Sequence, residues 1–246
     1  MNLAPAPDLA PDLALLITLD GTEPLTPRTV QAVNSLCERA EDADARGPVV
    51  LAVSGAPAPG TAPGGPLPLV NKWERALRRL ERLDLPTVTL VTGDCGGVAL
   101  EALLATDVRI AQPGTRLRPP AGPQGAWPGM ALYRLANQLG VAAARRTVLF
   151  GTPVPAERAL ALGLLDELAE DPALALADLA DRLGVVAGAG VVAGAGAAAT
   201  AGAGEGTAIR RQLMLDATTT SFEEALGRHL AACDRVLRAT TAEASS

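Results

Sequence analysis

Aromatic side chains and histidine are almost missing from this chain of 246 residues. It holds two Trp, two Phe, one Tyr and one His. A core must therefore be packed mainly by Leu, Val and Ala, and the 48% of hydrophobic residues is enough for a substantial one. A Ser-His-Asp hydrolase built on the single histidine, His229, would need partners that nothing in the sequence identifies.

Cysteine is also scarce, and basic residues do not outnumber acidic ones. Cys37, Cys95 and Cys233 are odd in number and far apart, which favours reduced thiols in a cytoplasmic protein over a disulfide framework. No spacing typical of a metal site occurs, so we expect no metal. The formal net charge of −6 argues against a nucleic-acid partner, because nucleic-acid phosphates call for a basic protein surface.

The chain lacks both a basic leader and a long apolar run. Residues 1–13 are proline-rich and acidic, unlike a signal peptide, and no stretch is long enough to cross a membrane. We predict a disordered lead-in at 1–13, a core over 14–184, a low-complexity Gly/Ala insertion at 185–206 and a C-terminal helical region at 207–246. In the insertion VVAGAG occurs twice in succession, and such small residues bury little surface.

The predicted core alternates strand and helix patterns. Apolar β-type runs and helical periodicities follow one another, with strands at 15–19, 49–53 and 87–92 and helices at 26–42 and 70–83. This order predicts parallel pairing through right-handed crossovers, which is the α/β class. The Gly/Pro-rich text between residues 54 and 68 predicts a loop.

The stretch Gly93–Ala111, beginning G-D-C-G-G, combines a strand end, a glycine turn and a helix start. The first N–H groups of a helix lack internal partners, so a developing oxyanion can be held there. Glu101 follows Val98 by three residues, which on a helix places its carboxylate on nearly the same face as those donors. The alternative interpretation is that Glu101 complements the helix dipole and that the glycines serve packing.

This arrangement resembles the crotonase (enoyl-CoA hydratase/isomerase) superfamily, as do the turn at 150–152 and the A-x-x-x-G-L pattern that ends at Leu164. The resemblance implies an α/β fold, namely a crotonase-like ββα spiral core with a C-terminal helical trimerisation region. It also implies an acyl-CoA substrate and no cofactor. The basic residues of helix 70–83 form either a solvated face or a contact for the phosphates of CoA.

The resemblance assigns site residues as well. Gly97 and Val98 match the oxyanion turn, and Ala62 matches the position of the second oxyanion N–H. Glu101 matches one of the two catalytic carboxylates. The predicted substrate pocket includes Cys95 and Trp127, and a small buried hydrophobe is the alternative interpretation of the cysteine. For the single tyrosine, Tyr133, core filling is favoured over an acyl pocket.

The second catalytic carboxylate of the family has no counterpart. Pro128-Gly129 matches the Pro-Gly turn that follows it, and counting back places Ala121 where the glutamate would be. No carboxylate occurs between Gln112 and Asn137. Hydration in this superfamily generally uses two acids. Loss of water from a cyclohexenone-type ring is strongly downhill, however, and can proceed with one base.

Several motifs look most similar to the B-type crotonase-like proteins of 3,5-dihydroxyphenylglycine biosynthesis, in glycopeptide-antibiotic pathways. They are W-E-R-A-L-R-R-L-E-R, G-D-C-G-G, W-P-G-M-A-L-Y-R-L, R-R-Q-L-M-L and S-F-E-E-A-L. This implies a homotrimer or a mixed oligomer with a related crotonase, and a type III polyketide synthase as functional partner. Two functions stay open: a CoA-thioester dehydratase, and a non-catalytic subunit that stimulates the synthase or a related crotonase.

Overall fold

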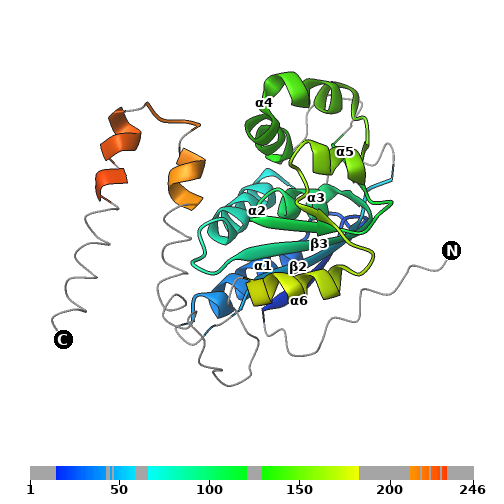
Figure 1. Cartoon of the computed structure of the whole chain (residues 1–246), viewed down its shortest axis with the longest axis horizontal. Helices are drawn as coiled ribbons and strands as arrows, with labels where there is room; N and C mark the ends of the chain where they lie inside the picture. Colours follow the sequence, from blue (N-terminus) through cyan, green and yellow to red (C-terminus); the bar gives the residue numbers. More distant parts are fainter. Residues whose placement is uncertain are drawn as a thin grey trace.

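A mainly parallel β-sheet forms the centre of the molecule (Figure 1). The computed structural model describes residues 15–42, 45, 47–58, 66–120, 129–182, 211–216, 218–221, 223–227 and 229–231. The elements of the main body are, in chain order, β1 (Leu16–Asp20), α1 (Pro27–Ala40), β2 (Val49–Gly55), α2 (Leu67–Leu80), β3 (Thr87–Gly96), α3 (Gly97–Leu103), β4 (Val108–Ala111), β5 (Arg116–Arg118), α4 (Ala131–Phe150), β6 (Val154–Pro155), α5 (Ala156–Ala161), β7 (Glu167–Leu168) and α6 (Pro172–Arg182).

The strand order confirms the predicted parallel pairing. The main path runs β1-β2-β3-β4-β7, and each neighbouring pair on it is parallel. The helices α1, α2 and α3 connect the first four strands, so each connection is a strand–helix–strand unit. The first helix begins as its sequence predicts, because the Thr26 side chain accepts the N–H of Thr29 and Pro27 occupies the first turn.

Helices cover both faces of the sheet. The apolar sides of α1, α2 and α3 pack into one large core cluster with alternate residues of β1, β2 and β3. The opposite face carries a smaller cluster in which Ala175 and Leu176 of α6 contact Val50, Leu90 and Ile110. Figure 1 shows α6 on the side of the sheet away from α2 and α3. The sheet is therefore buried on both faces, as its unbroken apolar strands require.

The third strand is longer than its sequence predicts, which corrects the expected turn at Gly93. Gly93 has a positive φ of 65°, which redirects the strand without ending it. Its last residues, Asp94–Gly96, then pair with Arg116–Arg118 of β5. Asp94 accepts hydrogen bonds from Nε of both arginines of β5, at 2.8 and 2.7 Å. The glycine turn lies instead at Gly97.

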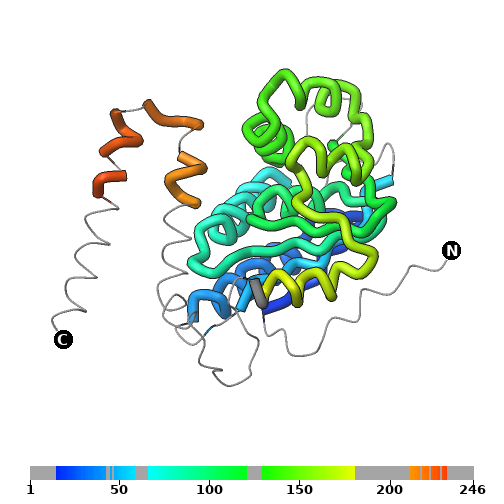
Figure 2. Tube along the Cα trace, viewed as in Figure 1, coloured from blue at the N-terminus to red at the C-terminus, as the bar shows by residue number. Residues whose placement is uncertain are grey.

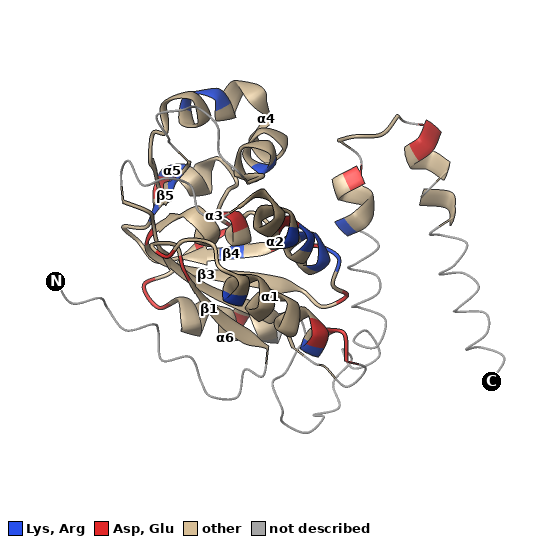
Figure 3. Cartoon of the chain, turned by 180° about the vertical axis from the view of Figure 1, so that it is seen from behind, with Lys and Arg blue, Asp and Glu red and all other residues tan. Residues whose placement is uncertain are grey.

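The second helix begins earlier than predicted, at Leu67 instead of Val70. Its first turn contains Pro68, which is compatible with a position where no backbone N–H is needed. The predicted basic face is present (Figure 3), with Lys72, Arg75, Arg78 and Arg82 exposed.

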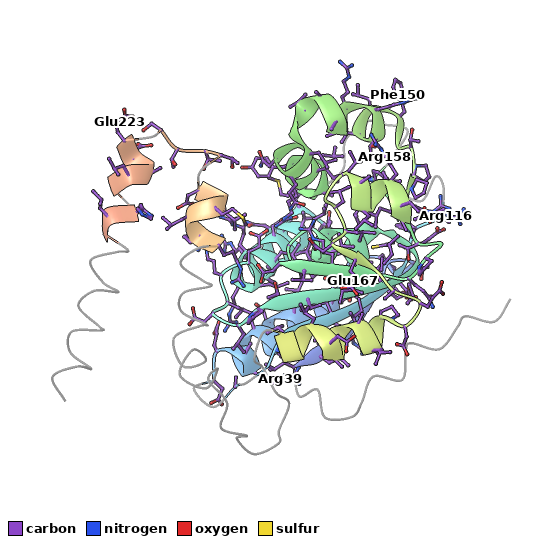
Figure 4. All side chains as sticks on the ribbon, viewed as in Figure 1. Arg39, Arg116, Phe150, Arg158, Glu167 and Glu223 are labelled. Carbon is purple, nitrogen blue, oxygen red and sulfur yellow. The ribbon has the colours of Figure 1, made fainter. Side chains whose placement is uncertain are left out.

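Helix α4 is a bent helix that leaves several apolar side chains exposed. Gly140 has non-helical angles inside it, and Gly151 ends it in the left-handed conformation, in agreement with the predicted turn. Tyr133 is 52% exposed, so the expectation that it fills the core is wrong. It lies on the side of the amphipathic helix opposite the buried Ala131 and Leu135. Phe150, at the outer end of α4, is 75% exposed (Figure 4).

The described part of the C-terminal region forms short helices beside the main body (Figure 2). Ser221 and Glu224 have the spacing that predicts a capping box, and the structure confirms it, because the two residues exchange side-chain-to-backbone hydrogen bonds. Arg211 anchors this region by bonding to the Asp107 carboxylate and the Leu83 carbonyl. The predicted segments 1–13 and 185–206 lie outside the described residues. Within the described part of the chain, no helix is both long and apolar enough to span a bilayer.

Candidate active site

The N-terminus of α3 lies where β1, β2 and β3 end. Gly97 has a φ of 53°, and a Cβ added to it would lie 3.0 Å from the Gly21 carbonyl oxygen and 3.0 Å from Cγ of Pro57. The main chain that leaves β1 and the proline ring that follows β2 therefore pack directly against this turn. Only glycine combines that angle with such close contact. The turn brings the predicted oxyanion residues Gly97 and Val98 to the first two positions of α3.

Glu101 is buried on the same helix, with 4% of its surface exposed. It is the fifth residue of α3, and no acidic residue lies in the first turn. The influence of the helix dipole fades beyond the first turn, so the dipole-complementing interpretation loses its basis. The indole Nε1–H of Trp73 donates a hydrogen bond of 2.6 Å to Oε2 of this carboxylate. A buried carboxylate of this kind has hydrogen-bond support for its charged form.

The main chain at Gly129 closes the other side of the carboxylate. A Cβ at this position would lie 1.8 Å from Oε1 of Glu101, which no side chain larger than hydrogen allows. The next residue, Met130, donates its backbone N–H to Oε1 of Glu74 at 2.9 Å. Gly129, the second residue of the Pro-Gly pair recognised in the sequence, therefore lies directly against the candidate catalytic residue.

An ion-pair network holds this part of α4 on α2. Arg134 bonds to Oε2 of Glu74 at 2.8 Å and to Oε1 of Glu81 at 2.9 Å, and its side chain is only 7% exposed. Burial by itself lowers the pKa of Arg134, but the two carboxylates outweigh it and the pKa is raised. The sequence does not predict that Arg134 is the partner of these carboxylates, because the contacts join residues more than 50 positions apart.

Arg109 fixes the far end of α3. Its Nη2 donates to the carbonyls of Leu104 and Thr106 at 3.2 and 3.1 Å, and its Nη1 donates to Oε1 of Gln138 at 2.9 Å. Burial lowers the pKa of Arg109, while Asp166 and Asp107 oppose that shift. An arginine at these carbonyls satisfies backbone acceptors that the end of a helix leaves open. Both ends of the helix that carries Glu101 are thus held in place.

Comparisons with known proteins show to which family the chain belongs. Residues 69–183 match the model of the enoyl-CoA hydratase/isomerase family. A protein of Amycolatopsis orientalis described as an enoyl-CoA hydratase is 48% identical over 224 residues, which cover 91% of this chain and 96% of that protein. The chain belongs to the enoyl-CoA hydratase/isomerase family. It is thereby a member of the crotonase superfamily, as the sequence motifs predicted.

Solved structures of this family share the fold. An enoyl-CoA hydratase from Shewanella pealeana superposes with a TM-score of 0.68 at 16% identity, covering 90% of this chain and 84% of that one. An enoyl-CoA hydratase/isomerase from Cupriavidus metallidurans gives 0.68 at 20% identity, with coverage of 90% and 84%. These likenesses establish the α/β fold with its parallel sheet.

Cys95 of this crotonase-superfamily member is fully buried in the main core cluster. Burial raises its pKa well above the usual range, and burial likewise raises the pKa of Cys37 to about 11. Both thiols are therefore uncharged at neutral pH, in line with the small buried hydrophobe that was the alternative for Cys95. Two other predicted site residues, Ala62 and Trp127, lie outside the described residues, as does Ala121.

An open groove of about 750 Å³ lies between the starts of α1 and α2. Its lining includes the apolar residues Leu25, Val30 and Leu69. Lys72, which belongs to the basic face of α2, also lines it. Of the predicted site residues that the structure describes, namely Cys95, Gly97, Val98 and Glu101, none lines this groove. Across the described ranges, no three His, Cys, Asp or Glu residues are arranged to hold a metal ion.

Proposed function

We propose that this crotonase-superfamily protein is a dehydratase that acts on a CoA-thioester polyketide intermediate. In this proposal it assists the formation of 3,5-dihydroxyphenylacetyl-CoA in dihydroxyphenylglycine biosynthesis, beside a type III polyketide synthase. The observation that carries the proposal is the Glu101 carboxylate, which is buried one helical turn from the oxyanion residue Val98 and accepts the Trp73 N–H. The sequence motifs quoted above supply the choice of pathway.

The proposed mechanism uses one carboxylate for both proton transfers. The backbone N–H of Val98, with that of Ala62, holds the thioester oxygen while negative charge develops on it. Glu101 removes a proton from the carbon next to the thioester carbonyl, which forms the enolate. As the enolate collapses, the carbon–oxygen bond to the leaving hydroxyl breaks. That hydroxyl takes the proton from Glu101, so that water departs and the carboxylate is regenerated.

The test is reconstitution with a type III polyketide synthase and malonyl-CoA. We expect aromatic product to form faster when the protein is added, and we expect an acyl-CoA analogue to bind it in calorimetry. Absence of both effects with folded protein would refute the proposal. Stimulation without any binding of the acyl-CoA analogue would point instead to the second candidate.

The second candidate is a non-catalytic partner subunit that stimulates the synthase or a related crotonase. The observation in its favour is that no carboxylate occurs between Gln112 and Asn137, where the family has its second acid. In that case product formation would depend on complex formation and not on Glu101. The two candidates therefore differ in the effect of a substitution at that residue.

We also propose that the protein assembles as a homotrimer or as a mixed oligomer with a related crotonase. Support comes from exposed apolar side chains on α4 and on the C-terminal helices, where Leu149 is 71%, Met214 65% and Leu230 57% exposed. Sedimentation at micromolar concentration tests this, alone and with the pathway partners. A monomer under every condition would contradict it.

A further inference from the structure

Two consecutive residues of α2, Trp73 and Glu74, fix the groups that lie on either side of the Glu101 carboxylate. Trp73 is fully buried and donates its indole N–H to Oε2 of Glu101. Glu74, the next residue, accepts the backbone N–H of Met130 and binds Arg134. These contacts fix the start of α4, and so they fix Gly129 against Oε1 of Glu101. A single turn of α2 therefore positions both the carboxylate and the main chain that covers it.

The geometry of the carboxylate leaves it little freedom. Oε2 accepts the indole N–H at 2.6 Å, and a donor in this position favours the charged form of the carboxylate. On the opposite side, the Gly129 main chain is so close to Oε1 that a methyl group would not fit. Rotation of the carboxylate would break the indole bond or strike this main chain. Its two oxygens are thus distinguishable by their surroundings.

We propose that Trp73 is a positioning residue for the proton transfer by Glu101. Its N–H holds Oε2 and stabilises the charged carboxylate, so that Glu101 enters the reaction as a base. Glu74 supports this arrangement by fixing the chain at Gly129. This inference rests on the dehydratase proposal for its kinetic consequence, whereas the contact between Trp73 and Glu101 has a spectroscopic consequence of its own.

The sharpest test replaces only the donor. Site-specific incorporation of β-(3-benzothienyl)alanine at position 73 substitutes sulfur for the indole N–H and keeps the shape of the side chain, so the core stays filled. A hydrogen bond to a charged group contributes enough free energy that its loss should lower kcat roughly tenfold. KM should stay unchanged, because Trp73 is fully buried and presents no surface to a substrate. The acid limb of the pH–rate profile should move to higher pH, by about one unit.

A double-variant cycle separates positioning from general structural support. In the Glu101→Gln background the analogue should cause no further loss of rate, because the proton carrier is already gone. Trp73→Phe should reproduce the pH shift but also lower the melting temperature, since it leaves a cavity. Equal kcat and an unmoved pH profile with the analogue at position 73 would overturn the inference.

An infrared measurement keeps this test independent of the proposed activity. The difference between the carboxylate bands of the parent protein and Glu101→Gln reports protonation of Glu101 alone. We expect its midpoint to lie at higher pH in the analogue protein. A moved midpoint in a protein that forms no product would refute the dehydratase proposal and retain the contact. An unmoved midpoint would refute the role of Trp73 whatever the activity.

Discussion

The turn at the N-terminus of α3 depends on Gly97. An alanine there would have to keep a φ of 53° and would press its Cβ against the Gly21 carbonyl and the Pro57 ring. The left-handed conformation alone costs about 1–2 kcal/mol in a non-glycine residue. We therefore expect Gly97→Ala to lower the unfolding free energy by more than Gly114→Ala, whose glycine has a φ of 83° but open space around it. Urea denaturation measures both, and equal losses would contradict the packing described here.

Asp94 makes a residue-scale contribution that depends on pH. Burial raises its pKa, but the hydrogen bonds and charges of Arg118 and Arg116 outweigh burial and leave the pKa lowered. A carboxyl with a lowered folded-state pKa stabilises the protein above the unfolded pKa of about 4 and loses this effect as the pH falls through the folded value. The melting temperature of the parent protein should thus exceed that of Asp94→Asn at pH 6. The difference should shrink toward pH 3, and a constant difference would be inconsistent with the ion pairs.

At the scale of elements, the ion-pair network between α2 and α4 yields the clearest prediction. Arg134→Met removes the cation and leaves the carboxylates of Glu74 and Glu81 largely buried without it. Breaking a buried pair from one side costs about 3–5 kcal/mol. Arg78→Ala removes only the exposed partner of Glu81 and should cost less than about 1 kcal/mol. Chemical denaturation compares the two variants, and similar losses would show that the network is not a major support of α4.

Local signals in the sequence predicted the strands and helices at the start of the core and several caps and turns, whereas long-range contacts determined the features that these signals left open. The cap at Thr26, the turn at Gly151 and the capping box at Ser221 depend on residues close in sequence, and the structure confirms them. The extension of β3 depends on pairing with β5, which the sequence of β3 does not contain.

The same reasoning applies to the candidate site. The spacing of Val98 and Glu101 on one helix predicts from sequence alone that they share a face. The indole N–H that donates to Glu101, however, lies 28 residues earlier in the chain, on α2. The helical periodicity of residues 70–83 predicts a buried face that includes Trp73, but nothing in that pattern distinguishes the polar indole nitrogen. The most informative contact of the site therefore required the fold.

For the whole molecule, Arg211 is the residue that ties the C-terminal helices to the main body. Its bonds to the Asp107 carboxylate and to the carbonyls of Leu83 and Leu85 are all made by one buried guanidinium. A hydrogen bond to a charged group contributes about 1.5–3 kcal/mol to stability. Loss of these bonds in Arg211→Ala should therefore speed amide hydrogen exchange in helix 211–216 by roughly tenfold or more. Arg145→Ala, on the exposed side of α4, is the control and should leave that exchange unchanged. Unaltered exchange in Arg211→Ala would mean that other contacts hold the region.

The central claim is that Glu101 moves a proton, and Glu101→Gln tests it most directly. Glutamine is nearly isosteric and its amide oxygen can still accept the Trp73 N–H, but it cannot take a proton at neutral pH. The control is Glu157→Gln, an exposed acidic residue in the first turn of α5. In the assay with a type III polyketide synthase and malonyl-CoA, Glu101→Gln should lower the stimulated rate by roughly 10²-fold or more with little change in melting temperature or assembly, and the control should match the parent. A Glu101→Gln protein that stimulates product formation as well as the parent would contradict the account and favour the non-catalytic subunit.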